Sequence, residues 1–107
     1  MIDFEEFLKV GLKVAKVIGA SRVEGSEKIL KLDVSLGEEN RQILAGIGRS
    51  YAPDDLIGKE VVIVANLEPR MIMGMESQGM IVAATDENGL AVVMCPEREV
   101  APGSGLK

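Results

Sequence analysis

The segment from Asn66 to Met80 holds the residue types best suited to binding a ligand. Arg70 can hold a phosphate with its planar guanidinium, whereas Asn66, Ser77 and Gln78 can hydrogen-bond to sugar hydroxyls or base edges. The methionines of the segment add a flexible, polarisable apolar surface that can lie against a base or a peptide. These residue types indicate a nucleic-acid or peptide contact, although the same residues could instead form a loop that plugs one end of the fold.

The side-chain inventory argues against catalysis. The chain has no histidine and a single cysteine, Cys95, so it can form neither a Ser-His nor a Cys-His nucleophile pair and no His-ligated metal site. It carries no acidic calcium loop and no glycine-rich phosphate loop after a strand pattern. We therefore expect no catalytic residues, no metal and no cofactor in this domain.

The same inventory bears on location. A lone cysteine cannot form an intrachain disulfide and favours a reducing compartment, so the cytoplasm is expected. No apolar run approaches the ~20 residues that a bilayer span needs, so no membrane partner is expected. The acidic N-terminus has the wrong sign for a secretory signal.

Net charge is −5, which is unusual for a protein that binds nucleic acid. Basic residues are nevertheless concentrated near the N-terminus, where Glu24 and Glu27 are the only acids among Lys9, Lys13, Lys16, Arg22, Lys28 and Lys31. Two interpretations stay open. The cations could form a basic face on an acidic body, or the charges could simply be mixed over the surface.

The hydrophobic pattern predicts a short helix followed by strands. Asp3 and Glu6 have the spacing of a capping box, so a helix is expected within residues 1–10. Residues 12–18 and 29–36 alternate between apolar and polar side chains, which is typical of half-buried strands, and residues 41–47 return as a partner strand.

The second half of the chain continues this pattern. Residues 53–58 predict one helical turn, the apolar run of residues 60–67 predicts a strand covered on both faces, and residues 79–85 and 90–95 flank an Asn-Gly hairpin signal. A helical element between the third and fourth strands is typical of a five-stranded Greek-key barrel. We therefore expect one all-β domain with short helices, consisting of a helix (1–10), a barrel (11–95) and a tail (96–107).

The string VVIVANLEPRMIMGMESQGMIVAA resembles the signature of the tRNA-binding domain family, roughly N-L-K-P-R/K-x-x-x-G-x-x-S-x-G-M. The segments FEEFLKVGLKVAKV, KILKLDVSLGEENRQILAGI and REVAPGSGLK resemble the family's opening helix and first strand, its second and third strands, and its closing tail. The resemblance therefore covers nearly the whole chain.

This resemblance implies an oligonucleotide-binding barrel (OB-fold) that binds tRNA without catalysing a reaction. The family is found as a free dimeric tRNA-binding protein and as the C-terminal domain or β subunit of methionyl-tRNA synthetases. There it would aid aminoacylation, and the ATP-dependent chemistry would belong to another part of the synthetase. The implied partners are tRNA, bound by its shape and backbone, and a second copy of the chain. The dimer contact is expected at the terminal segments, through Phe4, Phe7, Leu8 and Val100.

Carried over by position, the residues that match the family's tRNA-contact motif are Asn66, Arg70, Ser77 and Met80, and Lys13 matches an early basic position. Weaker candidates, indicated by strand geometry or side-chain type alone, are Lys31, Arg41 and Gln78. Two positions depart from the pattern, because Gly11 replaces an aspartate and Glu68 replaces a frequent lysine.

A group of protein-secretion chaperones shares this barrel and much of the motif. Its members bind unfolded peptide in an apolar groove between subunits, a role that Met71, Met73 and Met75 would suit. Peptide binding is therefore the alternative to tRNA binding.

Overall fold

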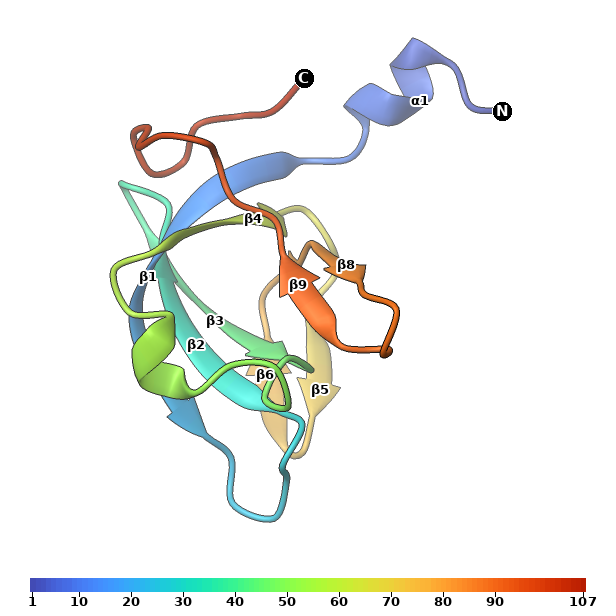
Figure 1. The fold of residues 1–107 in the computed structure, drawn as a ribbon. Coiled ribbons are helices and arrows are strands. Elements are labelled where there is room, and N and C mark those ends of the chain that lie inside the picture. The colour runs from blue at the N-terminus through green and yellow to red at the C-terminus, as the bar shows by residue number, and fades with distance from the viewer.

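The computed structural model, which describes residues 1–107, consists mainly of short strands (Figure 1). In chain order the elements are α1 (Phe4–Leu8), β1 (Leu12–Arg22), β2 (Leu30–Ser35), β3 (Asn40–Ala45), the 3-10 turn η1 (Pro53–Asp55), β4 (Glu60–Val64), β5 (Arg70–Ile72), β6 (Met75–Ser77), β7 (Met80–Ile81), β8 (Ala83–Thr85) and β9 (Ala91–Val93). The predicted all-β class with short helices is confirmed.

Five antiparallel strands form the main sheet in the order β3-β2-β1-β4-β7. The sheet curls into a nearly closed barrel because the Gln78 amide, just before β7, donates to the Gln42 carbonyl on β3 at 2.8 Å. The helical turn η1 lies between β3 and β4, which is the position expected for a five-stranded Greek-key barrel.

The burial of β2 and β4 follows their sequence patterns. In β2, Leu30, Leu32 and Val34 are fully buried and the residues between them face outward. In β4, Val61 to Val64 are all buried, because the outer face of the strand is also covered. Consecutive side chains of a strand point to opposite faces, so their burial confirms the predicted strand covered on both faces. The backbone of Val62 also bonds Met94 and Val82 at 2.9 Å each.

The predicted strand at residues 79–85 is divided into two. β7 pairs with β4, whereas β8 pairs with β9. Between them, Val82 donates to Val62 at 2.9 Å and accepts from Met94 at 3.0 Å. The strand changes partner at Val82, which explains the interruption. The Asn-Gly hairpin predicted at residues 88–89 is confirmed as the β8–β9 connection.

The tail pairs with the first half of β1. The Val14 amide donates to the Ser104 carbonyl at 2.8 Å, and the Leu106 amide donates to the Leu12 carbonyl at 3.0 Å. β2 pairs with β1 only from Lys16 onward, so the tail takes the edge of β1 that β2 does not cover. Both termini therefore lie at the same end of the barrel (Figure 1).

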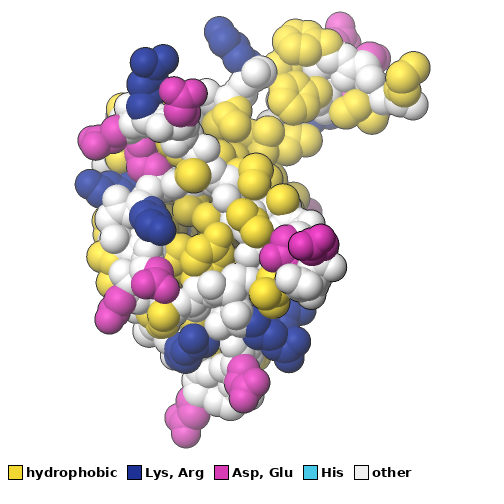
Figure 2. Space-filling model, viewed as in Figure 1, with side chains coloured by type: hydrophobic (Ala, Val, Ile, Leu, Met, Phe, Trp, Pro, Cys, Tyr) yellow, Lys and Arg dark blue, Asp and Glu magenta, His cyan; other side chains and the backbone are white.

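The helix α1 stands away from the barrel (Figure 1). Its predicted capping box is present, since the Glu6 amide donates to Asp3 Oδ1 at 2.9 Å. None of its residues is buried, and Phe4 and Leu8 keep 66% and 55% of their surface exposed. Figure 2 shows hydrophobic side chains gathered on this helix. Neither helical element has the length and apolar character needed to cross a membrane.

Candidate nucleic-acid interface

The centre of the Asn66 to Met80 segment is a hairpin. β5 and β6 pair with Arg70 opposite Ser77 and Ile72 opposite Met75. The turn residues Met73 and Gly74 have φ angles of 51° and 79°, and a two-residue turn with both φ values positive is the type I′ turn that matches strand twist. The sequence predicted an irregular loop here, because methionine is not a residue that signals positive φ.

The two faces of this hairpin differ in exposure. Because opposite residues point to the same side, Arg70, Ile72 and Ser77 share the face toward the barrel. Ser77 retains 3% of its surface and Ile72 is half-buried. On the other face, Met71 and Glu76 are exposed. The hairpin thus covers the outside of β3 with one face and presents the other to solvent.

The Ser77 hydroxyl both accepts and donates a hydrogen bond inside the protein. Ser77 Oγ accepts from the buried Leu44 amide at 3.0 Å and donates to the Gly79 carbonyl at 3.0 Å. The Leu44 N–H bonds Ser77 and therefore points to the edge of β3 opposite β2, where the hydroxyl replaces a strand hydrogen bond. The structure therefore gives Ser77 a position from which it holds the hairpin against β3.

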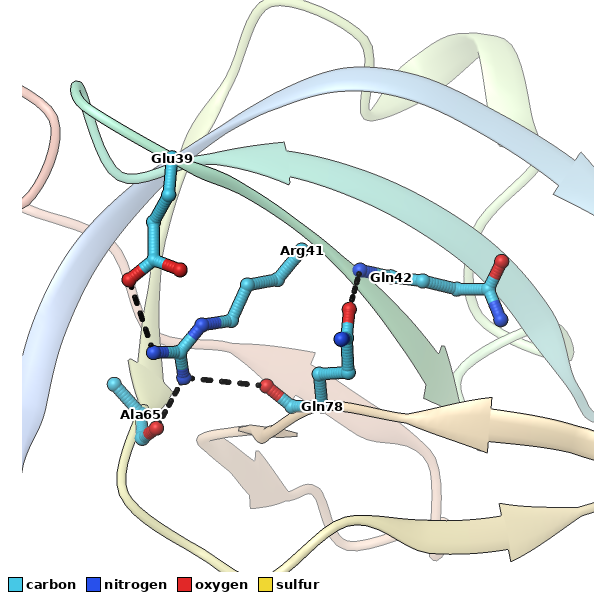
Figure 3. Close-up of polar contacts among 5 residues, drawn as sticks. All are labelled: Glu39, Arg41, Gln42, Ala65 and Gln78. Carbon is cyan, nitrogen blue, oxygen red and sulfur yellow. Dashed lines mark hydrogen bonds and ion pairs between the residues drawn. The ribbon is translucent and has the colours of Figure 1, made fainter.

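Gln78 closes the barrel together with Gln42 (Figure 3). Gln78 Oε1 accepts from the Gln42 amide at 3.0 Å, and Gln42 Nε2 donates to the Glu76 carbonyl at 2.9 Å. These bonds join β3 to β6 and to the residue that follows it, in place of a regular ladder.

Arg41 also bonds within the fold (Figure 3). Its guanidinium donates to the carbonyls of Ala65 and Gln78 and pairs with Glu39 at 3.1 Å. With 23% of its side chain exposed, Arg41 joins the ends of β3, β4 and β6.

Asn66 ties the entry of β1 to the end of β4. Its Oδ1 accepts from the Gly11 amide and its Nδ2 donates to the Lys9 carbonyl, each at 2.7 Å. A Cβ at Gly11 would lie 2.9 Å from the Asn66 side chain. The glycine that departs from the family pattern thus stands in direct contact with a motif residue.

A small hollow of about 60 Å³ lies between the hairpin and β3. It is lined by Leu44, Leu67, Glu68, Arg70, Ile72, Ser77, Gly79 and Met80. Arg70 and Met80 are exposed at its rim, and Arg70 forms no ion pair, since Arg41–Glu39 is the one pair within 4.0 Å. Glu68 lines the same hollow, which weakens the positive potential around Arg70.

The other predicted cations lie in different places. Lys31 is directly opposite Leu44 on the outer face of the sheet, beside the hollow. Lys13 is opposite Ile63, a core residue, so its side chain lies on the inward side of the barrel wall at the open end. The structure thus brings Arg70 and Met80 together at the hollow, places Lys31 next to Leu44 on its wall, and leaves Lys13 outside this group.

The basic residues near the N-terminus do not form one face. Arg22 donates to the Gly48 carbonyl at 3.0 Å, Lys16 lines a separate cavity, and Lys31 lies beside the hollow. Figure 2 shows cationic and acidic side chains interspersed on the visible face. This arrangement favours the interpretation of mixed charges.

The separate cavity is larger, about 530 Å³, and lies between β4, β9 and the tail. Three cations and three acids line it, namely Lys16, Lys59, Arg98, Glu60, Glu97 and Glu99. Because these charges balance, the cavity offers no net attraction for a phosphate backbone. No group of three or more His, Cys, Asp or Glu side chains could hold a metal ion.

Two residues of the candidate interface were not predicted from the sequence. Leu44 forms the floor of the hollow, and Gln42 closes the barrel. The run Ile43-Leu44-Ala45, all buried, breaks the alternation expected of a strand with one face in solvent. That break was a signal that something covers Leu44 from outside.

Comparison with known families decides the identity of the fold. The model described as "Putative tRNA binding domain" matches residues 12–105. The chain belongs to this tRNA-binding domain family. The match contains the whole barrel, the β5–β6 hairpin and most of the tail, so the predicted resemblance is confirmed.

Relatives of this tRNA-binding domain include methionine–tRNA ligases. The chain is 48% identical over 105 residues to the ligase of Caldanaerobacter subterraneus subsp. tengcongensis and 49% identical over 107 residues to that of Methanothrix thermoacetophila. The aligned region covers 98% and 100% of this chain but 16% of each ligase. The chain therefore spans a small part of the length of these relatives.

Solved structures agree. The tRNA-binding domain superposes on the MetRS related protein of Pyrococcus horikoshii with a TM-score of 0.94 at 36% identity, covering 100% of this chain and 98% of the other. It also superposes on the chaperone CsaA of Bacillus anthracis with a TM-score of 0.92 at 30% identity, covering 100% and 99%. The barrel type predicted from sequence is confirmed by these neighbours.

Proposed function

We propose that this chain is a non-catalytic tRNA-binding module that serves a methionyl-tRNA synthetase, as its C-terminal domain or as a β subunit. The observation that carries the proposal is the family match over residues 12–105, joined to 48–49% identity with a segment of methionine–tRNA ligases. By holding tRNA, the module raises the local concentration of substrate for a catalytic region elsewhere. A cytoplasmic location follows from this role.

The contact centres on the hollow between the β5–β6 hairpin and β3. Arg70 is exposed, free of ion pairs and suited to a phosphate. Lys31 is paired with Leu44, which lines the hollow, and supplies a second cation, whereas Met80 offers apolar surface at the rim. Lys13 lies apart from them and would contact RNA only near the open end of the barrel.

The remaining motif residues support this surface from behind. Asn66 and Ser77 bond the protein backbone with all their polar side-chain groups. Gln78 does so through Oε1, and the Arg41 guanidinium bonds two backbone carbonyls and Glu39. We therefore assign them a positioning role in the tRNA contact.

Recognition of folded tRNA by shape and backbone suits this surface. The chain has no tryptophan and only three other aromatic residues, Phe4, Phe7 and Tyr51, which argues against reading a single strand by base stacking. Each phosphate contact contributes roughly 0.7–0.9 to the slope of log K against log salt. Two or three contacts would lose roughly ten- to thirtyfold in affinity between 50 and 200 mM salt.

A homodimer through the terminal segments would compensate for this modest affinity. Phe4 and Leu8 on α1 are exposed, Phe7 is half-buried, and Val100 keeps 36% of its surface. These side chains gain from burial against a second copy. Two tRNA-binding surfaces in one particle would strengthen binding by avidity.

Filter binding with total tRNA at 50 and 200 mM salt tests the proposal, with duplex DNA of similar length as the control. We expect tRNA to bind more tightly than the duplex and its affinity to fall with salt. Equal binding of tRNA and duplex DNA would contradict the proposal.

A second candidate function is binding of unfolded peptide. It is favoured by the 30% identity to the CsaA chaperone and by the exposed side chains of Met71 and Met73. An extended apolar peptide that binds at micromolar concentration, in the absence of a preference for tRNA, would support this second function instead.

A further inference from the structure

The tip of the β5–β6 hairpin is strained. Met73 is the one residue other than glycine with positive φ, at 51°. For a residue other than glycine, this left-handed conformation lowers the stability of the folded state. Asparagine or glycine would adopt the first position of a type I′ turn more easily. The methionine is therefore not the residue that folding alone would select.

Packing does not offset this strain. Met73 keeps 50% of its surface exposed and Met71 keeps 67%. A Cβ built on the neighbouring Gly74 would meet no atom within 4 Å, so the turn projects into open space. Strained residues that packing does not require are concentrated at binding sites.

The charges around the tip disfavour a phosphate there. Glu76 is directly opposite Met71 on the exposed face, and Glu68 lines the hollow at the base of the hairpin. The one cation of the hairpin, Arg70, lies three residues before Met73, roughly 10 Å along the strand at ~3.3 Å per residue. The end of the hairpin nearest the barrel is therefore cationic, whereas its tip is apolar and flanked by acidic side chains.

In a folded RNA, the apolar surfaces that a protein can reach are the faces of bases unstacked in loops, bulges and ends. A thioether packs favourably against an aromatic face. We propose that Met73, assisted by Met71, packs against the face of an unstacked base in folded tRNA while Arg70 holds a nearby phosphate. This inference rests on the proposed tRNA-binding function and adds a contact to nucleobases that the backbone contacts do not supply.

The position of the tip leaves it available for this contact. The hairpin points away from the end of the barrel at which α1 and the tail lie (Figure 1). A dimer formed through the terminal segments would therefore leave both tips uncovered.

Met73→Asn tests the inference, with Met73→Leu as the matched control. Asparagine relieves the strain and removes the apolar contact, whereas leucine keeps both the strain and an apolar side chain. For Met73→Asn we expect Tm to rise by about 3–6 °C and tRNA affinity to fall about three- to tenfold. For Met73→Leu we expect Tm within about 2 °C and affinity within about twofold of the original chain.

Two further readouts separate a base contact from a general effect. The salt slope of Met73→Asn should equal that of the original chain, because an apolar contact releases no counterions. Binding to a blunt RNA duplex without unpaired loop bases should be unchanged by the substitution. A weaker affinity for the duplex and for tRNA alike would overturn the assignment to an unstacked base.

Other outcomes overturn it as well. If Met73→Asn raises Tm and leaves tRNA affinity unchanged, the tip makes no contact, although the proposed function survives. If the substitution abolishes peptide binding but not tRNA binding, the tip serves a peptide partner. If the original chain does not prefer tRNA over duplex DNA, the proposed function itself fails before the variants are compared.

Discussion

Replacing Ser77 by alanine separates a positioning role from a tRNA contact. The substitution removes an oxygen that accepts from the Leu44 amide at 3.0 Å and donates to the Gly79 carbonyl at 3.0 Å. The Leu44 amide then remains buried without a partner, because Leu44 keeps 5% of its surface. A buried unpaired amide costs about 1–3 kcal/mol, and a lost neutral hydrogen bond costs about 1 kcal/mol. We expect a total loss of about 2–4 kcal/mol in the free energy of unfolding.

This loss should be visible in thermal denaturation followed by circular dichroism. For a domain of this size, 1 kcal/mol corresponds to roughly 4–5 °C in Tm, so Ser77→Ala should melt roughly 8–20 °C lower. Ser21→Ala is the control, because Ser21 is exposed at the end of β1 and its hydroxyl forms no hydrogen bond within the protein. It should shift Tm by less than about 2 °C.

The same variants should be titrated with tRNA at a temperature where both are folded. Because Ser77 Oγ faces Leu44 and Gly79, we expect the affinity of Ser77→Ala to stay within about threefold of the original chain. A variant that melts normally but loses more than about tenfold in tRNA affinity would refute this reasoning and restore Ser77 as a direct contact.

Three further outcomes follow from the structure. Arg70→Ala should weaken tRNA binding at low salt and make the slope of log K against log salt shallower by about 0.7–0.9, as measured by filter binding over a salt series. Arg41→Met should lower the free energy of unfolding, measured in urea, by about 1.5–3 kcal/mol, because it leaves two carbonyls without their charged donor. The control Glu39→Gln should lower it by less than about 1 kcal/mol, because Glu39 is exposed. The double variant Phe4→Glu with Leu8→Glu should convert a homodimer to a monomer, as measured by light scattering. Its Tm at low concentration should not change, because neither side chain is buried within the chain. An unchanged mass would contradict the proposed dimer contact.

Local patterns were enough to predict much of the fold. The capping box of α1, the alternation of β2, the buried run of β4 and the β8–β9 hairpin all depend on residues close together in the chain. The β5–β6 hairpin was missed because its turn uses Met73, which adopts positive φ without the glycine or asparagine that would indicate it.

The internal bonds of the motif residues could not be read from sequence. Asn66 bonds Lys9 and Gly11, which lie 57 and 55 residues away, and Ser77 bonds Leu44, 33 residues away. In each case the partner is a backbone atom, so no residue type at the distant position signals the bond. Polar residues in a motif therefore suggested ligand contacts, whereas the geometry assigns several of them to the protein itself.

The pairing of the tail with β1 has a consequence for handling the protein. Residues 103–106 cover the backbone of Leu12 and Val14 on the edge that β2 leaves free. Proteolysis after Pro102 would expose that edge next to the apolar surface of α1, and an unpaired strand edge beside apolar side chains is a template for intermolecular pairing. A sample trimmed at its C-terminus would therefore tend to aggregate, and intact mass should be checked before any loss of tRNA binding is attributed to the hairpin.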